Sequence, residues 1–470
     1  MQTRKYTTLR IILTALPMAV LLTLFGLWVF FSPPGFVESA LMSALILGLF
    51  VALGIRYVPQ LMDWFRPSSA DLLPRTENSR TNRAFRLREI LAVALALLVF
   101  RALVALLAFG LHYHIYGYTG TFFTAQRLWA TYGDAAHYLS IASRGYVSEA
   151  AATNMEHLRL VFLPFYSYVV WFFSLFTSNL VRAGFYVSNL ATILGGVVLY
   201  RLVLFDYDRG VARRAVRYYC IVPIAFILSS IMSDGLFFFL SVSCLYAARK
   251  KNFMLAVFFG AIAAYTRLLG LVVLVPLVME YVKNIQEARR EHRADGWKFA
   301  LMQSLYGLSL LLVPLAFVLY LFQCYLISGN FFQAFVYQDQ NWAQHFQVFF
   351  ITPAVQTDYL INAVLDGTIT DVFGLWLPNL LAISLSLTLI LSSHKKMRAS
   401  YVAYFICYFF MSVSASWLLS APRYLFCCFP LLIALALLTK KKWVDWTVSI
   451  ASLVCFVLYF YMFLARYQVY

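Results

Sequence analysis

Charged residues are scarce in this sequence. They make up 12% of its 470 residues, against about a quarter in soluble domains. Acidic residues are the scarcest, with 20 Asp and Glu against 37 Lys and Arg. Hydrophobic residues reach 62%, and the mean hydropathy is +0.76. These values exclude a soluble enzyme, a disordered chain and a fibrous protein, and they indicate a polytopic membrane protein. The apolar runs are continuous rather than alternating, which argues against an outer-membrane barrel.

Three other features are missing. The 7 cysteines lie in or beside apolar runs and form no CxxC pair, so neither a disulfide framework nor a zinc site is predicted. No internal repeat is visible, although many transporters are built from inverted repeats. No N-x-S/T sequon occurs, although long lumenal loops often carry one. The missing sequon favours a prokaryotic plasma membrane, and an endoplasmic reticulum membrane with a lumenal site stays open as the alternative.

Long apolar runs predict about thirteen transmembrane helices, because one span needs about 20 apolar residues. The predicted spans are 11–31, 38–55, 90–111, 184–204, 216–232, 235–248, 252–266, 268–282, 299–322, 372–392, 400–418, 423–439 and 445–465. Basic residues recur in every second connection, namely 56–88, 205–217, 249–251, 283–298, 394–398 and 440–442. The positive-inside rule places these connections and the N-terminus in the cytoplasm. Since topology explains the +17 charge, no nucleic-acid partner is predicted.

Two long loops remain on the predicted extracytoplasmic side, at 112–183 and 323–371. Loops of this length in a compact protein are usually functional. The apolar, aromatic segment 158–178 would break the charge alternation if it crossed, so it is predicted to be a re-entrant or interface-lying helix. We divide the chain into an N-terminal two-helix addition, 1–89, and a catalytic transmembrane domain, 90–470. The basic loop 56–88 is interpreted as a topology determinant that contacts anionic membrane lipids.

The first outer loop holds the most suggestive spacing. Asp134, His137 and Ile141 recur at helical intervals and therefore share one helix face. A carboxylate and an imidazole one turn apart, just beyond a span, could act on a bound substrate. The alternative is that Asp134 only caps a short interfacial helix.

The string GDAAHYLSIASRGY from Gly133, followed by Glu149 and VFLPFY, resembles the first-loop signature of PIG-V-type mannosyltransferases. Further elements of that family follow in order: Ser233-Asp234-Gly235, Thr266-Arg267 with Gly270, Gly329-Asn330 through Gln340-Asn341-Trp342, and Pro422-Arg423-Tyr424 with Pro430. The sequence departs from the family pattern at Gly133, Ser167, Asn330 and Phe331. Together these elements touch most of the chain after residue 90.

The resemblance implies a GT-C-type fold and inverting transfer of a sugar, mannose by family default, from a polyprenyl-phosphate donor to an acceptor hydroxyl. The acceptor is a lipid, a glycan or a protein. Asp134 and Asp234 are the implied catalytic carboxylates, with Asp134 as the base. The implied substrate-binding residues are His137, Glu149, Arg267, Gln340, Trp342, His345, Arg423 and Tyr424. Arginine suits this task because its fork grips phosphate with two hydrogen bonds. No cofactor is implied.

Other interpretations of the same residues stay open. Arg267 and Arg423 could be lipid-facing anchors, although an ionisable residue in a membrane is a functional hypothesis by default. A divalent metal held by His112, His114, His137 and His157 is a weaker alternative. For the whole chain, the alternatives to a glycosyltransferase are a lipid-linked saccharide flippase or transporter and an envelope polysaccharide polymerase or ligase. A transporter predicts functional charges near the bilayer midplane, and a polymerase predicts that Asp134 is dispensable.

Overall fold

The computed structural model describes residues 2–32, 37–65, 87–117, 120–152, 155–290 and 296–469. Within these ranges all regular structure is helical, and the one β-type contact is an isolated bridge between Phe346 and Ala415. The predicted all-α polytopic membrane fold is confirmed.

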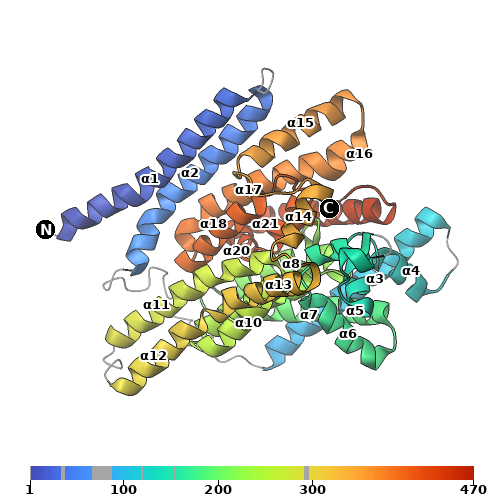
Figure 1. Cartoon of the computed structure of the whole chain (residues 1–470), viewed down its shortest axis with the longest axis horizontal. Coiled ribbons are helices and arrows are strands. Elements are labelled where there is room, and N and C mark those ends of the chain that lie inside the picture. Colours follow the sequence, from blue (N-terminus) through green and yellow to red (C-terminus); the bar gives the residue numbers. More distant parts are fainter. Residues whose placement is uncertain are drawn as a thin grey trace.

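The first half of the chain forms α1 (Gln2–Phe31), α2 (Val37–Phe65), α3 (Leu87–Tyr116), α4 (Phe122–Ala130), α5 (Ala135–Arg144), α6 (Phe165–Thr177), α7 (Leu180–Val203), α8 (Arg209–Ile221) and α9 (Asp234–Arg249). The second half forms α10 (Phe253–Thr266), α11 (Leu274–Arg290), α12 (Trp297–Ser309), α13 (Leu312–Ser328), α14 (Gln333–Trp342), α15 (Ile351–Leu365), α16 (Ile369–Asp371), α17 (Leu377–Ser393), α18 (Ala399–Val413), α19 (Ala421–Phe426), α20 (Pro430–Leu438) and α21 (Lys442–Leu464). In Figure 1, α1 and α2 run along one flank, and α4–α6 lie at the end opposite α12.

Eight helices in these described ranges are long and apolar enough to cross a membrane. They are Thr8–Phe31, Ser39–Phe65, Leu87–Tyr116, Leu180–Val203, Leu268–Arg289, Trp297–Ser328, Ile369–Lys396 and Lys442–Leu464. Each coincides with a predicted span. The predicted spans at 235–248, 252–266, 400–418 and 423–439 form shorter helices, and 216–232 is not one helix. The predicted number of thirteen is therefore not confirmed.

The predicted span 216–232 and the predicted basic loop 205–217 are both wrong in their boundaries. Helix α8 begins at Arg209, inside the predicted loop, and ends at Ile221. Pro223 follows, and proline both lacks a backbone N–H and disfavours the helical conformation of the residue before it. The chain then runs irregularly, with one 3-10 turn at Ala225–Ser229, until α9 begins at Asp234. Because of this break, Asp234 is the first residue of the buried helix α9.

The predicted re-entrant or interfacial segment 158–178 is sharply bent. It consists of a 3-10 helix, Met155–Val161, and α6, which meet at an angle of 108° around Pro164. Helix α6 leaves Trp171, Phe172 and Phe176 largely exposed. Aromatic side chains of this kind favour the membrane interface. The geometry is compatible with both predicted arrangements, a re-entrant helix and an interface-lying helix, and does not choose between them.

Helix α9 is the centre of the bundle, because nearly all of its side chains are buried and it packs against α7 and α10. Gly235 permits the close approach of α7, since a Cβ there would lie 2.8 Å from Thr192 Oγ1 and 3.2 Å from the Ser188 carbonyl oxygen. The first turn of α9 is thus held against α7 by backbone packing.

The chain folds back on itself directly after α10. Arg267 is extended, with φ −150° and ψ 146°, and a 3-10 helix, Leu268–Val273, follows. A Cβ at Gly270 would lie 2.1 Å from the Ala263 carbonyl oxygen, so only glycine fits this return. The fold-back leaves the Arg267 side chain at the end of α10 rather than along its side.

The N-terminal helices contact the rest of the chain mainly through α2, which packs on α15 and α17, while Phe25 and Trp28 of α1 pack on Phe350. Ser39 Oγ donates a hydrogen bond to Asp358 Oδ1 at 2.7 Å. The boundary between the predicted domains 1–89 and 90–470 stays a prediction. Most of the predicted basic loop 56–88, namely residues 66–86, lies outside the described residues.

A buried charge cluster joins four separate segments at the end of the bundle opposite α5. Arg398 donates to both oxygens of Glu280, at 2.6 and 2.8 Å, and Arg249 Nη2 donates to Asp206 Oδ1 at 2.6 Å. All four side chains are at most 10% exposed. The two guanidinium groups balance the two carboxylates, which is the condition for burying such charges.

Breaking this cluster is expected to be costly. Arg398→Met should lower the free energy of unfolding by about 3–5 kcal/mol, because it leaves the Glu280 carboxylate buried without its main partner. The control is Arg217→Met, which removes a more exposed ion pair with Asp445 and should cost at most about 1 kcal/mol. Thermal unfolding of the two purified variants in detergent compares them. Equal losses would show that the buried cluster contributes no more than a surface pair.

Candidate active site

The Asp134 carboxylate is not used to cap its helix. Asp134 occupies the N-cap position of α5 but makes no capping hydrogen bond with its side chain. Its Oδ2 instead accepts a hydrogen bond from Arg423 Nη1 at 2.7 Å. The side chain remains 35% exposed. The capping alternative is therefore wrong. The Asp134 carboxylate is paired with Arg423 and is also accessible to solvent.

Arg423 bridges the two predicted catalytic carboxylates. It lies on the short helix α19, and its side chain is 5% exposed. While Nη1 contacts Asp134, Nε lies 3.0 Å from Asp234 Oδ2 and Nη2 lies 2.9 Å from the same oxygen. The lipid-anchor alternative is excluded for Arg423, because this guanidinium is buried between two acids.

Arg267 approaches the same carboxylate from the end of α10. Its Nη1 donates to Asp234 Oδ1, and its guanidinium lies 4.8 Å from the centre of the Tyr424 ring. The side chain is 10% exposed. Among the described residues, Nε and Nη2 of Arg267 have no hydrogen-bond acceptor. Arg267 thus keeps donors free for a further anion.

Asp234 is the anchor of this cluster. The side chain is fully buried, and both oxygens accept hydrogen bonds from guanidinium groups. It offers no exposed surface to an acceptor, so the geometry suits holding Arg267 and Arg423 in place. The four side chains carry two positive and two negative charges. Asp234 and Arg423 lie on α9 and α19, Asp134 directly precedes α5, and Arg267 directly follows α10.

Two hydroxyl groups beside the cluster were not predicted as site residues. Tyr138 Oη and Ser233 Oγ lie 2.8 Å apart, both buried, and join α5 to the residue before Asp234. Ser167 Oγ donates to the Tyr138 carbonyl oxygen at 2.9 Å, which ties α5 to α6. Hydroxyl side chains at these positions carry no distinctive spacing, so only adjacency to Asp134 and Asp234 could have suggested them.

His137 lies beside the cluster and packs on Phe162, with ring centres 4.6 Å apart and planes 14° apart. Burial lowers the pKa of His137, and the nearby Arg159 lowers it further against the opposing effect of Asp134. The ring is therefore neutral at neutral pH. Since burial disfavours protonation in the folded state, the folded state loses stability relative to the unfolded chain as the pH falls below the ordinary histidine range.

The other predicted substrate-binding residues, Glu149, Gln340, Trp342 and His345, lie on or around α14. Glu149 accepts a hydrogen bond from Tyr337 Oη of α14 at 3.0 Å, and exposed His345 lies 3.0 Å from Asp339 Oδ1. Gln340 is exposed, and Trp342 packs in a small cluster around Tyr337. Within the described ranges, none of the four predicted residues hydrogen-bonds to or forms an ion pair with the Asp134–Arg423 cluster. Their role stays a prediction.

Within the described residues, no group of three or more His, Cys, Asp or Glu side chains is placed to hold a metal ion. These residues therefore offer no ligand set for the predicted metal alternative. The His112 ring lies 4.8 Å from that of Tyr116, and the His114 ring lies 6.5 Å from that of Tyr461.

The acid–guanidinium cluster lies where helices break inside an otherwise apolar bundle, and ionisable groups in such a place mark a functional site. The family model described as mannosyltransferase (PIG-V) matches residues 113–366, more than half of the chain. The chain therefore belongs to the PIG-V mannosyltransferase family and is an integral-membrane glycosyltransferase. Asp134, Asp234 and Arg267 lie inside the matched segment, and Arg423 lies beyond it. No curated protein and no solved structure matches this chain.

Proposed function

We propose that this enzyme transfers mannose from a polyprenyl-phosphate donor to an acceptor hydroxyl, with inversion at the anomeric carbon and with Asp134 as the base. Family membership supports the sugar and the reaction class. The observation that carries the rest is the 2.7 Å contact between Asp134, which is partly exposed, and Arg423, which is buried. This contact supports the proposal, because the Asp134 carboxylate lies next to a buried cation and the reaction needs both a proton acceptor and a positive charge.

The proposed reaction exchanges one bond for another. The acceptor oxygen forms a bond to the anomeric carbon while the bond from that carbon to the phosphate oxygen breaks. The electron pair of the broken bond stays on the polyprenyl phosphate, and the hydroxyl proton passes to an Asp134 carboxylate oxygen. A carboxylate is a weak base at neutral pH, so the proton moves late, when the sugar–phosphate bond is already largely broken.

The arginines serve the departing phosphate. The donor phosphate gains negative charge as it leaves, and a preorganised cation is most effective where charge develops. Arg267 has Nε and Nη2 available for the phosphate oxygens, and Asp234 fixes its orientation through Nη1. Since the cluster without substrate is electrically balanced, a bound phosphate adds a single negative charge beside two guanidinium groups.

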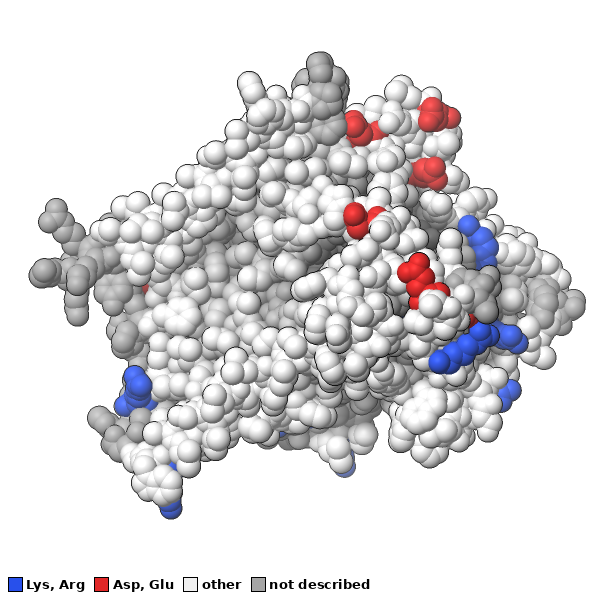
Figure 2. Space-filling model, in the orientation of Figure 1, with Lys and Arg blue, Asp and Glu red and all other residues white. Residues whose placement is uncertain are grey.

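We further propose that the site faces the extracytoplasmic side of a prokaryotic plasma membrane and that the N-terminus is cytoplasmic. In an endoplasmic reticulum the equivalent site would be lumenal. The charge distribution supports this orientation. Figure 2 shows acidic side chains gathered over α14–α16, in the second predicted outer loop. The lysines that precede α10 lie at the other end of that helix from Arg267.

The test supplies radiolabelled polyprenyl-phosphate mannose to membranes that contain the full chain. We expect label to enter a product that membranes without the chain do not form. A parallel reaction with GDP-mannose, in membranes depleted of polyprenyl phosphate, should give none. Transfer from GDP-mannose alone would overturn the proposed donor. Movement of lipid-linked sugar across vesicles without any transfer would favour the transporter alternative.

A further inference from the structure

A buried cation near the middle of α3 has no acidic partner. Arg101 is only 4% exposed, and its hydrogen-bond partners in the described part of the chain are all uncharged. A charged side chain inside a membrane bundle is costly, and as a rule it marks a functional element. Arg101 does not belong to the acid–guanidinium cluster, so its presence calls for a separate explanation.

The Arg101 guanidinium holds the irregular residues 222–233 between α8 and α9, here called the break segment. Its Nη2 donates to Ser229 Oγ, and its Nη1 lies 3.5 Å from the Ala225 carbonyl oxygen. The third contact runs from Nε to Asn189 Oδ1 of α7 at 3.3 Å. Because the break segment is not a continuous helix, side chains of neighbouring helices must satisfy its polar groups inside the bundle. Arg101 does this from α3.

The break segment contacts the chain on both sides of Asp134. The Ile231 N–H donates to the Ala130 carbonyl oxygen at 3.0 Å. Ser233 Oγ lies 2.8 Å from Tyr138 Oη. In the sequence, Ala130 precedes Asp134 by four residues and Tyr138 follows it by four. The position of the Asp134 turn therefore depends on the position of the break segment.

The same segment also determines where the second carboxylate lies. Asp234 directly follows it and begins α9. Met232 packs closely on Gly133, since a Cβ added to this glycine would lie 3.0 Å from Met232 Cε. The break segment thus contacts the residue before Asp134 and ends at Asp234. It sets the relative position of the two carboxylates that Arg423 bridges.

We propose that Arg101 is a positioning residue for the transfer reaction. By holding the break segment from α3, it fixes the spacing between Asp134 and Asp234 at which Arg423 contacts both. Within the described residues Arg101 makes no hydrogen bond to the cluster, so it acts through the break segment. A displacement of about 1 Å at a catalytic group can lower a rate about 10²-fold. The proposal rests on the transfer activity proposed above, but it does not require that Asp134 is the base.

Arg101→Met removes the guanidinium group and keeps most of the side-chain volume. We expect kcat for transfer from labelled polyprenyl-phosphate mannose to fall about 10–100-fold. The donor KM should change less than about threefold, because Arg267 and Arg423 are left in place to bind the phosphate. The rates are normalised to folded protein, as measured by thermal unfolding in detergent. A wild-type kcat in the folded variant would overturn the proposal.

A double variant separates positioning from general destabilisation. Ser233→Ala removes the contact between the break segment and Tyr138. If Arg101 acts through the same segment, adding Arg101→Met to Ser233→Ala should lower kcat little beyond the larger single loss, whereas independent effects multiply. Multiplied losses would contradict the proposal. Arg214→Met is the matched control and should keep the wild-type kcat, because Arg214 Nε donates to the Ala436 carbonyl oxygen elsewhere in the bundle.

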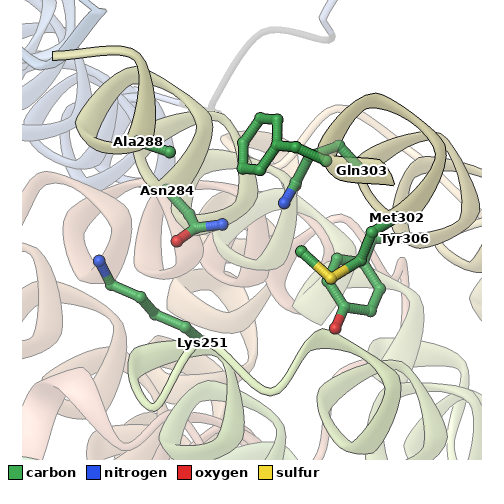
Figure 3. Close-up of a pocket in the computed structure, with 7 residues that line it drawn as sticks. Lys251, Asn284, Ala288, Met302, Gln303 and Tyr306 are labelled. Atoms are coloured by element: carbon green, nitrogen blue, oxygen red, sulfur yellow. The ribbon is translucent and has the colours of Figure 1, made fainter. Parts of the chain in front are cut away.

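Hydrogen exchange of the full-length protein in detergent reports on the break segment directly. In Arg101→Met the Ile231 amide should exchange about tenfold faster, the effect expected of losing one buried hydrogen bond. Helix α12 is the internal reference and should keep its exchange rate. It lines a separate cavity of about 230 Å³ near the start of α10, at the opposite end of that helix from Arg267 (Figure 3).

Unchanged exchange at residues 222–233 would overturn the proposal even if kcat fell. If Arg101→Met does not fold, Arg101→Lys takes its place, since lysine keeps the charge but loses the forked contacts. If the wild type transfers no mannose from this donor, the proposed function fails, and the exchange rates still decide whether Arg101 holds the segment.

Discussion

Asp134→Asn should reduce mannose transfer about 10²–10⁴-fold, the range expected when a general base is removed. The asparagine side chain has nearly the same shape but cannot take up the acceptor proton. The donor KM should change little, since Arg267 and Arg423 remain anchored on Asp234. The measurement is the initial rate of transfer from labelled polyprenyl-phosphate mannose at matched protein levels, resolved into kcat and KM.

The same substitution should leave the fold largely intact. Asp134 is 35% exposed, and Arg423 keeps its hydrogen bonds to Asp234, so the free energy of unfolding should fall by about 1 kcal/mol or less. Asp366→Asn, an exposed acid at the end of α15, is the control and should keep full activity. Transfer by Asp134→Asn within threefold of the wild-type rate would rule out Asp134 as the base.

The sequence predicted the members of the cluster but not their pairing. The family resemblance marks Asp134, Asp234, Arg267 and Arg423, which lie on or directly beside four helices far apart along the chain. Hydropathy and spacing cannot show that Asp234 is the buried member and Asp134 the exposed one, because this difference arises from tertiary packing around α9. Nor could spacing show that Glu149 pairs with α14 instead of joining the cluster.

The errors in the fold have identifiable causes. The apolar residues of 216–232 predict a span, yet Pro223 interrupts the helix, and this proline is the signal in the sequence that the span is broken. The short helices α9 and α10 are packed among neighbouring helices. Their residues are apolar because they lie inside the bundle as well as because they contact lipid, so an apolar run alone does not establish a full span. The alternation of basic connections does not distinguish a basic loop from a basic helix such as α8.

Asp234→Asn should abolish transfer and also destabilise the protein, in contrast to Asp134→Asn. The substitution leaves two buried guanidinium groups with one partly exposed carboxylate between them. Breaking a buried ion pair in this way costs about 3–5 kcal/mol, because the remaining charge is not compensated. Thermal unfolding in detergent and the transfer assay measure the two losses separately.

A second variant separates the two roles of Asp234. Adding Arg267→Met to Asp234→Asn removes the surplus positive charge and should restore much of the thermal stability, because the remaining pair, Asp134 and Arg423, is balanced. Transfer should stay absent, since the phosphate has lost one of its two cations and Arg423 has lost its anchor. If the double variant regained activity along with stability, Asp234 would be a structural residue only. If Asp234→Asn were as stable as the wild type, the carboxylate would not hold the arginines at all.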